Sequence, residues 1–198
     1  MRIIRALLLC LLAAVPALAA EPTPLACTGP FARDSSHDRL VAAFGAANVA
    51  FGKVDGPESS EHEATILFGS DPERRLEVTW RGATRSRPDV ISFEGSGWVA
   101  PHGIRIGASL DAVVRRNGQP FRISGFGWDN AGLTAFQRGR LAAVPGGCRI
   151  AVRFAPGVPE PLGRRFAPIM GNREVRSDHP LMRAARPTVT EIFLSYSD

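Results

Sequence analysis

The chain of 198 residues has no long apolar run; the longest, at residues 6–15, has about ten residues, whereas a membrane-spanning helix needs roughly 20. This run follows a positively charged start and precedes the small residues Ala17 and Ala19, a pattern typical of a secretory signal peptide. We therefore expect residues 1–19 to be a signal peptide and the mature protein to have no transmembrane anchor. Its expected location is periplasmic or secreted.

Cysteine is scarce: Cys10 lies in the apolar run, which leaves Cys27 and Cys148 in the mature protein. These two stand far apart, without a CxxC motif or an adjacent histidine. The spacing excludes a compact zinc site made of cysteine pairs and gives no support to a catalytic thiol. Two cysteines in an oxidising compartment are typical of a disulfide. We expect a Cys27–Cys148 bond that closes a loop of roughly 120 residues and stabilises the fold by about 4–5 kcal/mol.

Lysine is nearly absent as well, since Lys53 is the only lysine among 24 basic residues. An arginine-rich chain with 20 glycines and 16 prolines indicates a GC-rich bacterial genome, and together with export it favours the periplasm of a Gram-negative bacterium. The formal net charge of +5 would suit nucleic acid, but the arginines are scattered and acidic residues lie between them. We therefore expect no nucleic-acid partner.

Motifs for catalysis and for metal binding are missing too. The nearest approach to a G-x-S-x-G nucleophile elbow, residues 94–98, has the wrong spacing. The Glu-His-Glu trio at residues 61–63 makes a poor metal site, because adjacent residues of a strand point to opposite faces. Met170, His179 and Met182 could suit copper(I), but they are spread over thirteen positions. The sequence predicts neither a metal nor a cofactor.

What the chain does contain is an internal likeness. Residues 36–45 and 109–118 align at an offset of 73, with serine, aspartate, valine and glycine at matching positions. The serine can cap the start of a helix and the glycine can end it, so each copy predicts a short helix. Residues 75–80 and 149–154 align at an offset of 74, and both show the alternation of half-buried strands.

This pattern predicts an α+β protein of two tandem modules, each a helix plus an antiparallel sheet, whose sheets could join into one continuous sheet. The modules would span residues 20–100 and 101–198, the second with a long loop rich in proline and arginine at residues 155–187. The alternative is a single α+β domain with coincidental local likeness.

One stretch resembles the helical start of a known module. Residues 104–110, Val113 and residues 117–121 follow an I-x-x-G-x-[ST]…V…G-x-P layout similar to that of the β-lactamase inhibitor protein and of small outer-membrane-assembly lipoproteins. The resemblance implies tandem modules that form a concave, protein-binding surface. This chain differs in lacking a lipid-attachment cysteine and a cysteine pair in each module. Residues 125–129, Gly-Phe-Gly-Trp-Asp, are similar to a motif of uncharacterised secreted bacterial proteins, which implies no activity.

Candidate binding residues lie around that second motif. Phe126 and Trp128 would form a binding rim with an aromatic anchor, and Asp129 and Asn130 would supply the turn beside it. Trp98 is a further aromatic candidate. The alternative interpretation is that the tryptophans are core residues next to a capped turn.

From these features we expect a non-catalytic binding protein, inhibitor-like or assembly-factor-like, that takes a protein partner or a cell-envelope ligand on an open sheet face. Such a module should expose an apolar patch there. One alternative is a periplasmic hydrolase in which Asp129 and His102 converge in a concave pocket. Another is a small-molecule carrier with a closed apolar cavity.

Overall fold

The computed structural model describes residues 21–56, 60–158 and 162–196, so the signal peptide expected at residues 1–19 lies outside the described residues. Within these ranges, none of the helices has the length and the apolar content that a membrane crossing requires. The α-helices in the described ranges are short: α1 (His37–Phe44), α2 (Leu110–Asn117) and α3 (Pro180–Ala184).

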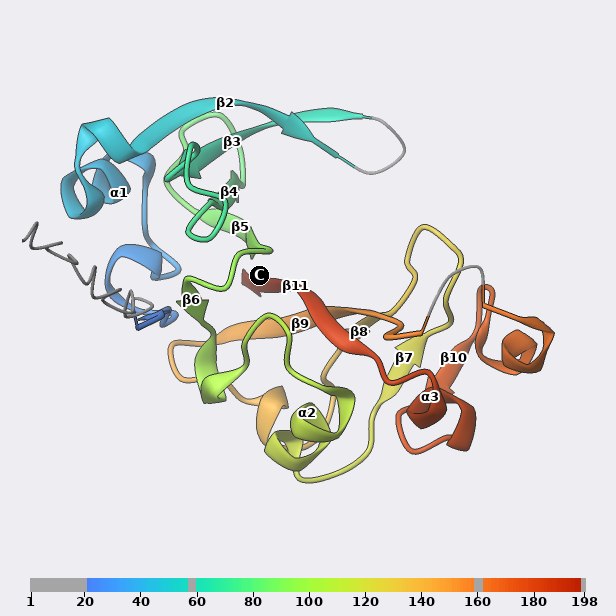
Figure 1. Ribbon diagram of the computed structural model, residues 1–198. Helices are drawn as coiled ribbons and strands as arrows, with labels where there is room; N and C mark the ends of the chain where they lie inside the picture. The colour runs from blue at the N-terminus through green and yellow to red at the C-terminus, as the bar shows by residue number, and fades with distance from the viewer. Residues whose placement is uncertain (1–20, 57–59, 159–161, 197–198) are drawn as a thin grey trace, which may run out of the picture.

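The molecule is built on one large antiparallel sheet, which confirms the α+β fold class (Figure 1). Seven strands follow the order β2-β3-β4-β5-β11-β9-β8, so the sheet runs without a break through both halves of the chain. The bounds are β2 (Val49–Asp55), β3 (Glu61–Leu67), β4 (Leu76–Trp80), β5 (Pro88–Phe93), β8 (Leu133–Ala135), β9 (Cys148–Ala155) and β11 (Thr188–Tyr196).

Two small sheets accompany the large one. β1 (Thr23–Pro24) runs parallel to β6 (Trp98–Val99), and β10 (Glu174–Arg176) runs antiparallel to β7 (Arg122–Ser124). Short 3-10 helices complete the described elements: η1 (Gly29–Phe31), η2 (Ala46–Asn48), η4 (Pro101–Gly103), η5 (Arg140–Ala142) and η6 (Arg164–Ile169).

Both predicted helices begin and end where the sequence indicates. The side chains of Ser36 and Ser109 accept hydrogen bonds from the backbone N–H three residues later, which caps α1 and α2. Gly45 and Gly118 follow the last helical residues at φ angles of 84° and 82°, a region that glycine enters at low cost. The local signals for both helices are therefore confirmed.

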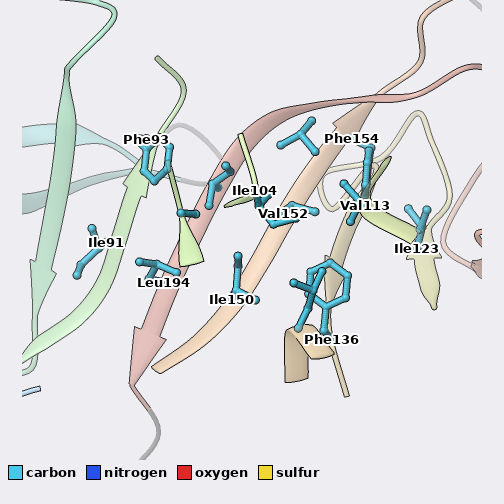
Figure 2. Packing of buried hydrophobic residues seen from close by; sticks show 14 of the residues in the cluster. Ile91, Phe93, Ile104, Val113, Ile123, Phe136, Ile150, Val152, Phe154 and Leu194 are labelled. Atoms are coloured by element: carbon cyan, nitrogen blue, oxygen red, sulfur yellow. The ribbon is translucent and has the colours of Figure 1, made fainter. Parts of the chain in front are cut away.

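The core lies between the helices and one face of the sheet (Figure 2). Ile150, Val152 and Phe154 of β9 alternate with residues of the opposite face, and each is at most 1 % exposed. Figure 2 shows Val113 of α2 and Ile104 among these strand residues. Because alternate residues of each strand enter the core, the intervening side chains point to the opposite face.

The two halves of the chain follow a similar order, although the first contributes four strands to the large sheet and the second three. In each, a short helix precedes strands that step from an edge of the sheet to its centre: β2, β3, β4 and β5 in the first half, and β8, β9 and β11 in the second. β5 and β11 pair at the centre, where Ile91 lies opposite Leu194. Descent from a duplicated ancestor, and the division into modules 20–100 and 101–198, stay predictions.

The described parts of the predicted loop, residues 155–158 and 162–187, contain regular structure. η6, β10 and α3 lie in this segment, and Phe166, Ile169, Val175 and Met182 enter the core. Six prolines and six arginines suggested a loop, but apolar residues between them are buried, and burial of apolar surface stabilises the segment.

Cys27 and Cys148 form the expected disulfide. Their Cα atoms are 5.9 Å apart, within the usual range, and both residues are buried. The bond joins the segment after β1 to the first residue of β9. It therefore fixes the start of the described chain to the second half of the fold, and it fits an oxidising compartment.

Candidate functional site

One face of the large sheet points away from the core, and we call it the open face. Its side chains alternate with the core residues of β4, β5, β9 and β11. The strand register places Ser92 of β5 between Glu77 and Phe193. It also places Glu191 of β11 opposite Arg153 of β9. Polar and charged residues from four strands therefore meet at the middle of this face.

A hollow of about 970 Å³, which we call the central groove, lies on the open face. Asp55 and His62 of the β2–β3 hairpin line one part of it, and Asp129 and Asn130 line another. The hairpin is the cyan pair of strands that extends across the top of Figure 1. The floor comes from the four central strands and the residues beside them: Arg75, Glu77, Thr79, Val90, Ser92, Glu94, Arg153, Glu191 and Phe193.

Two ion pairs organise the floor of the central groove. The Arg75 guanidinium donates to the Glu77 carboxylate at 2.6 Å, and Nε of Arg153 donates to Oε2 of Glu191 at 2.9 Å. Nη1 of Arg153 also donates to the backbone carbonyls of Asp129 and Ala131, at 3.3 and 3.2 Å. Arg153 therefore ties the loop that carries Asp129 to the sheet.

Carboxylates outnumber guanidinium groups in the central groove. Burial raises the pKa of Glu191, the ion pair with Arg153 opposes this shift, and the negative charges of Glu94 and Glu77 add to it. The Glu191 carboxylate is therefore partly removed from water and lies near the carboxylates of Glu94 and Glu77, and both effects disfavour its charged form. The groove thus has an acidic floor in a chain whose formal net charge is +5.

The open face differs from the expected apolar patch. Val90 and Phe193 contribute apolar surface to the central groove, but charged and polar side chains surround them. The Arg153 guanidinium lies 5.8 Å from the centre of the Phe193 ring, close enough for a cation–π contact. The open face is therefore mixed and not the contiguous apolar patch that we expected, because glutamate, arginine, serine and threonine lie around Val90 and Phe193.

The loop at residues 125–132, which we call the Trp128 loop, presents an exposed tryptophan. Trp128 is 59 % exposed, whereas Phe126 is 1 % exposed and packs in the core. The backbone N–H of Phe126 donates to the carbonyl of Ile169 at 3.0 Å, and the N–H of Gly171 donates to the carbonyl of Phe126 at 2.9 Å. The predicted rim thus separates into a buried anchor, Phe126, and an exposed ring, Trp128.

Trp98, the other aromatic candidate, is buried. It is 2 % exposed, and its indole N–H donates to the backbone carbonyl of Arg74 at 2.8 Å. Its ring packs edge-on against Phe31 and Phe44. These contacts give Trp98 a structural place in the core, and its ring does not reach the open face.

The structure does not bring His102 and Asp129 together. His102 lies in η4, and its Nε2 is 3.0 Å from the backbone carbonyl of Ala143. Asp129 lines the central groove, and His102 is not among the residues that line that hollow. The geometry therefore provides no acid–base pair from these two residues.

The residues considered for metal binding have other roles. His62 lies on the open face, while Glu61 pairs with Lys53 at 2.7 Å. Nδ1 of His179 accepts from the backbone N–H of Leu181 at the start of α3, and Met182 is fully buried. Among the described residues, no group of three or more histidine, cysteine, aspartate or glutamate side chains could hold a metal ion.

The floor of the central groove was missed by the sequence reasoning. Glu77 and Arg153 occupy the polar positions of the two predicted strands, so the alternation itself placed them on the outer face. Their meeting with Glu191 depends on the pairing of β11 with β5 and β9, which connects distant parts of the chain. The charged residues at the outer positions of the predicted strands are the sequence signal that could have identified Glu77 and Arg153 as site residues.

Comparisons with known proteins assign no family to this chain. No protein-family model and no curated protein matches the chain. Among solved structures, the fold is similar to the crystal structure of the uncharacterized protein yfeY from Escherichia coli, with a TM-score of 0.48 and 12 % sequence identity. The similarity covers 88 % of this chain and 99 % of that chain.

Proposed function

We propose that this chain is a non-catalytic binding protein of the periplasm or the extracellular space, which takes a protein partner or a cell-envelope ligand on its open face. The observation that carries the proposal is the central groove: a hollow over the middle of a seven-stranded sheet, between the β2–β3 hairpin and the Trp128 loop. The disulfide and the pattern of a signal peptide support export.

The chemistry of the central groove supports recognition rather than catalysis. Arg75–Glu77 and Arg153–Glu191 hold each other in place, so their charges are presented in fixed positions. Fixed charges favour a complementary surface and reject a surface of the wrong sign, which gives a partner specificity. The exposed ring of Trp128, beside the groove residue Asp129, supplies the kind of aromatic surface on which binding energy concentrates.

Affinity capture from cell-envelope extract of the source organism tests this proposal with two matched variants. Ser92→Trp fills the central groove, and Arg115→Trp adds the same side chain to the exposed side of α2. We expect wild type and Arg115→Trp to retain the same partner, and Ser92→Trp to retain at most about a tenth as much, since hot-spot losses reach about 2 kcal/mol or more. Equal capture by all three proteins would overturn the proposal.

A further inference from the structure

A second hollow, of about 590 Å³, lies between β8 and the small β7–β10 sheet. β7 pairs with β10 and is also joined to β8, where the hydroxyl of Thr134 donates to the backbone carbonyl of Arg122. Its residues are distinct from those of the central groove. We call it the arginine pocket, and it is lined by Pro120, Phe121, Arg122, Ser124, Leu133, Thr134, Ala135, Gln137, Arg138, Ala151, Glu174 and Arg176.

Three arginines, Arg122, Arg138 and Arg176, line the arginine pocket. The register of β7 and β10 places Arg122 directly opposite Arg176, an arrangement in which like charges destabilise a sheet. Asp178 neutralises Arg176 through two hydrogen bonds of 2.9 and 2.7 Å. Arg122 has a weaker partner, because its Nε lies 3.7 Å from the Glu174 carboxylate, beyond hydrogen-bond distance.

Arg138 adds the third guanidinium, from the segment after β8. Its side chain is exposed and forms no hydrogen bond or ion pair with other side chains of residues 21–56, 60–158 and 162–196. Asp178 therefore neutralises the charge of Arg176, and Glu174 neutralises that of Arg122 only weakly. The charge of Arg138 is solvated by water. An anion placed between them would reduce the repulsion across β7 and β10.

The rest of the arginine pocket is apolar on one side. Leu133, Ala135 and Ala151 line this side, and Phe121, which is 8 % exposed and packs on Phe136 and Phe154 in the core, adds the little surface that it leaves exposed. The volume of this hollow falls within the range of small-molecule sites, and its lining joins a smaller apolar side to a larger set of charged and polar side chains. This lining is complementary to a ligand with one negatively charged end and one apolar end.

We propose that the arginine pocket binds a small amphipathic anion. A phosphate or carboxylate group lies between Arg122 and Arg138, where the planar guanidinium forks can hold two oxygens at once. The apolar part of the ligand lies against Leu133, Ala135 and Ala151. This inference does not depend on the proposed partner binding at the central groove, since the two hollows are lined by different residues.

Calorimetric titration with dihexanoyl phosphatidic acid tests the pocket, with dihexanoylglycerol as the probe that keeps the apolar chains and lacks the charge. We expect the phosphatidic acid to bind, dihexanoylglycerol to bind at least about tenfold more weakly, and inorganic phosphate to fall between them. The affinity should fall as salt is raised, because the guanidinium groups are exposed to solvent.

Two substitutions that remove one positive charge each make the test specific to the pocket. Arg138→Gln should weaken binding of the phosphatidic acid about tenfold, the loss that follows when a charged hydrogen bond is removed. Arg105→Gln, at an exposed arginine outside the pocket, should leave the affinity unchanged. Equal affinity of the two variants would overturn the proposal.

Vesicles distinguish a soluble ligand from a lipid surface. If the protein binds vesicles of phosphatidylglycerol but not dihexanoyl phosphatidic acid, the arginines contact a membrane surface and the proposed pocket is refuted. If it binds the soluble phosphatidic acid and Arg138→Gln abolishes this binding, the pocket is supported whether or not vesicles bind.

Discussion

Removal of the Cys27–Cys148 disulfide should destabilise the fold by about 5 kcal/mol. The bond joins residues 121 positions apart, and the chain-entropy relation gives about 4.9 kcal/mol at 25 °C for a loop of that size. For a chain of this length, each kcal/mol lowers the melting temperature by about 2–4 °C, so the expected decrease is about 10–20 °C. The double variant Cys27→Ala/Cys148→Ala removes the bond without leaving a free thiol.

Urea unfolding followed by circular dichroism measures this loss, with oxidised and reduced wild type compared alongside the double variant. Reduced wild type should match the variant, because both lack the same loop constraint. In both proteins two other contacts would still hold the first described segment against the fold. Leu25 is buried in the core, and the hydroxyl of Tyr196 donates a hydrogen bond to the backbone carbonyl of Phe31. A loss below about 1 kcal/mol would show that the bond does not constrain the unfolded chain as reasoned.

Three further substitutions test local parts of the account, each by urea unfolding. Ser109→Ala should lower the free energy of unfolding by about 1 kcal/mol, because it removes the side-chain cap of α2. An unchanged free energy of unfolding would show that this cap does not stabilise the protein. Gly132→Ala should lower the free energy of unfolding by at least about 2 kcal/mol, because φ of Gly132 is +67° and an added Cβ would clash with the Phe154 carbonyl. A variant as stable as wild type would refute this clash. Because the pKa of Glu191 is raised above its usual 4.5, its contribution to stability is present at low pH and lost as pH rises through the folded value. Glu191→Gln should therefore gain stability relative to wild type as pH rises above about 4.5, and a difference in the free energy of unfolding that does not change with pH would contradict the raised pKa.

The elements predicted from the sequence are those whose signals are local. Ser36 and Ser109 cap their helices as expected, since a cap depends on residues three positions away. The alternation in β4 and β9 identified strands for the same reason: neighbouring residues report which face is buried. The disulfide could be predicted because only two cysteines remained to pair.

The parts that could not be predicted depend on contacts between distant segments. The acidic floor of the central groove forms when Glu191 of β11 comes beside Arg153 and near Glu77, and sequence spacing does not encode that pairing. The exposure of Trp128 beside a buried Phe126 depends on the packing of the Trp128 loop against residues 169–171. The same is true of the arginine pocket, which needs β10 to pair with β7.

Site-specific photo-crosslinking tests the central claim, that the open face is the binding surface, most directly. A photoreactive side chain at Thr79 would lie in the central groove, and one at Arg115 would lie on the exposed side of α2. In cells that produce the protein, the account predicts one discrete crosslinked partner from Thr79 and none from Arg115. The same crosslinks from both positions, or a partner captured from Arg115 alone, would contradict it.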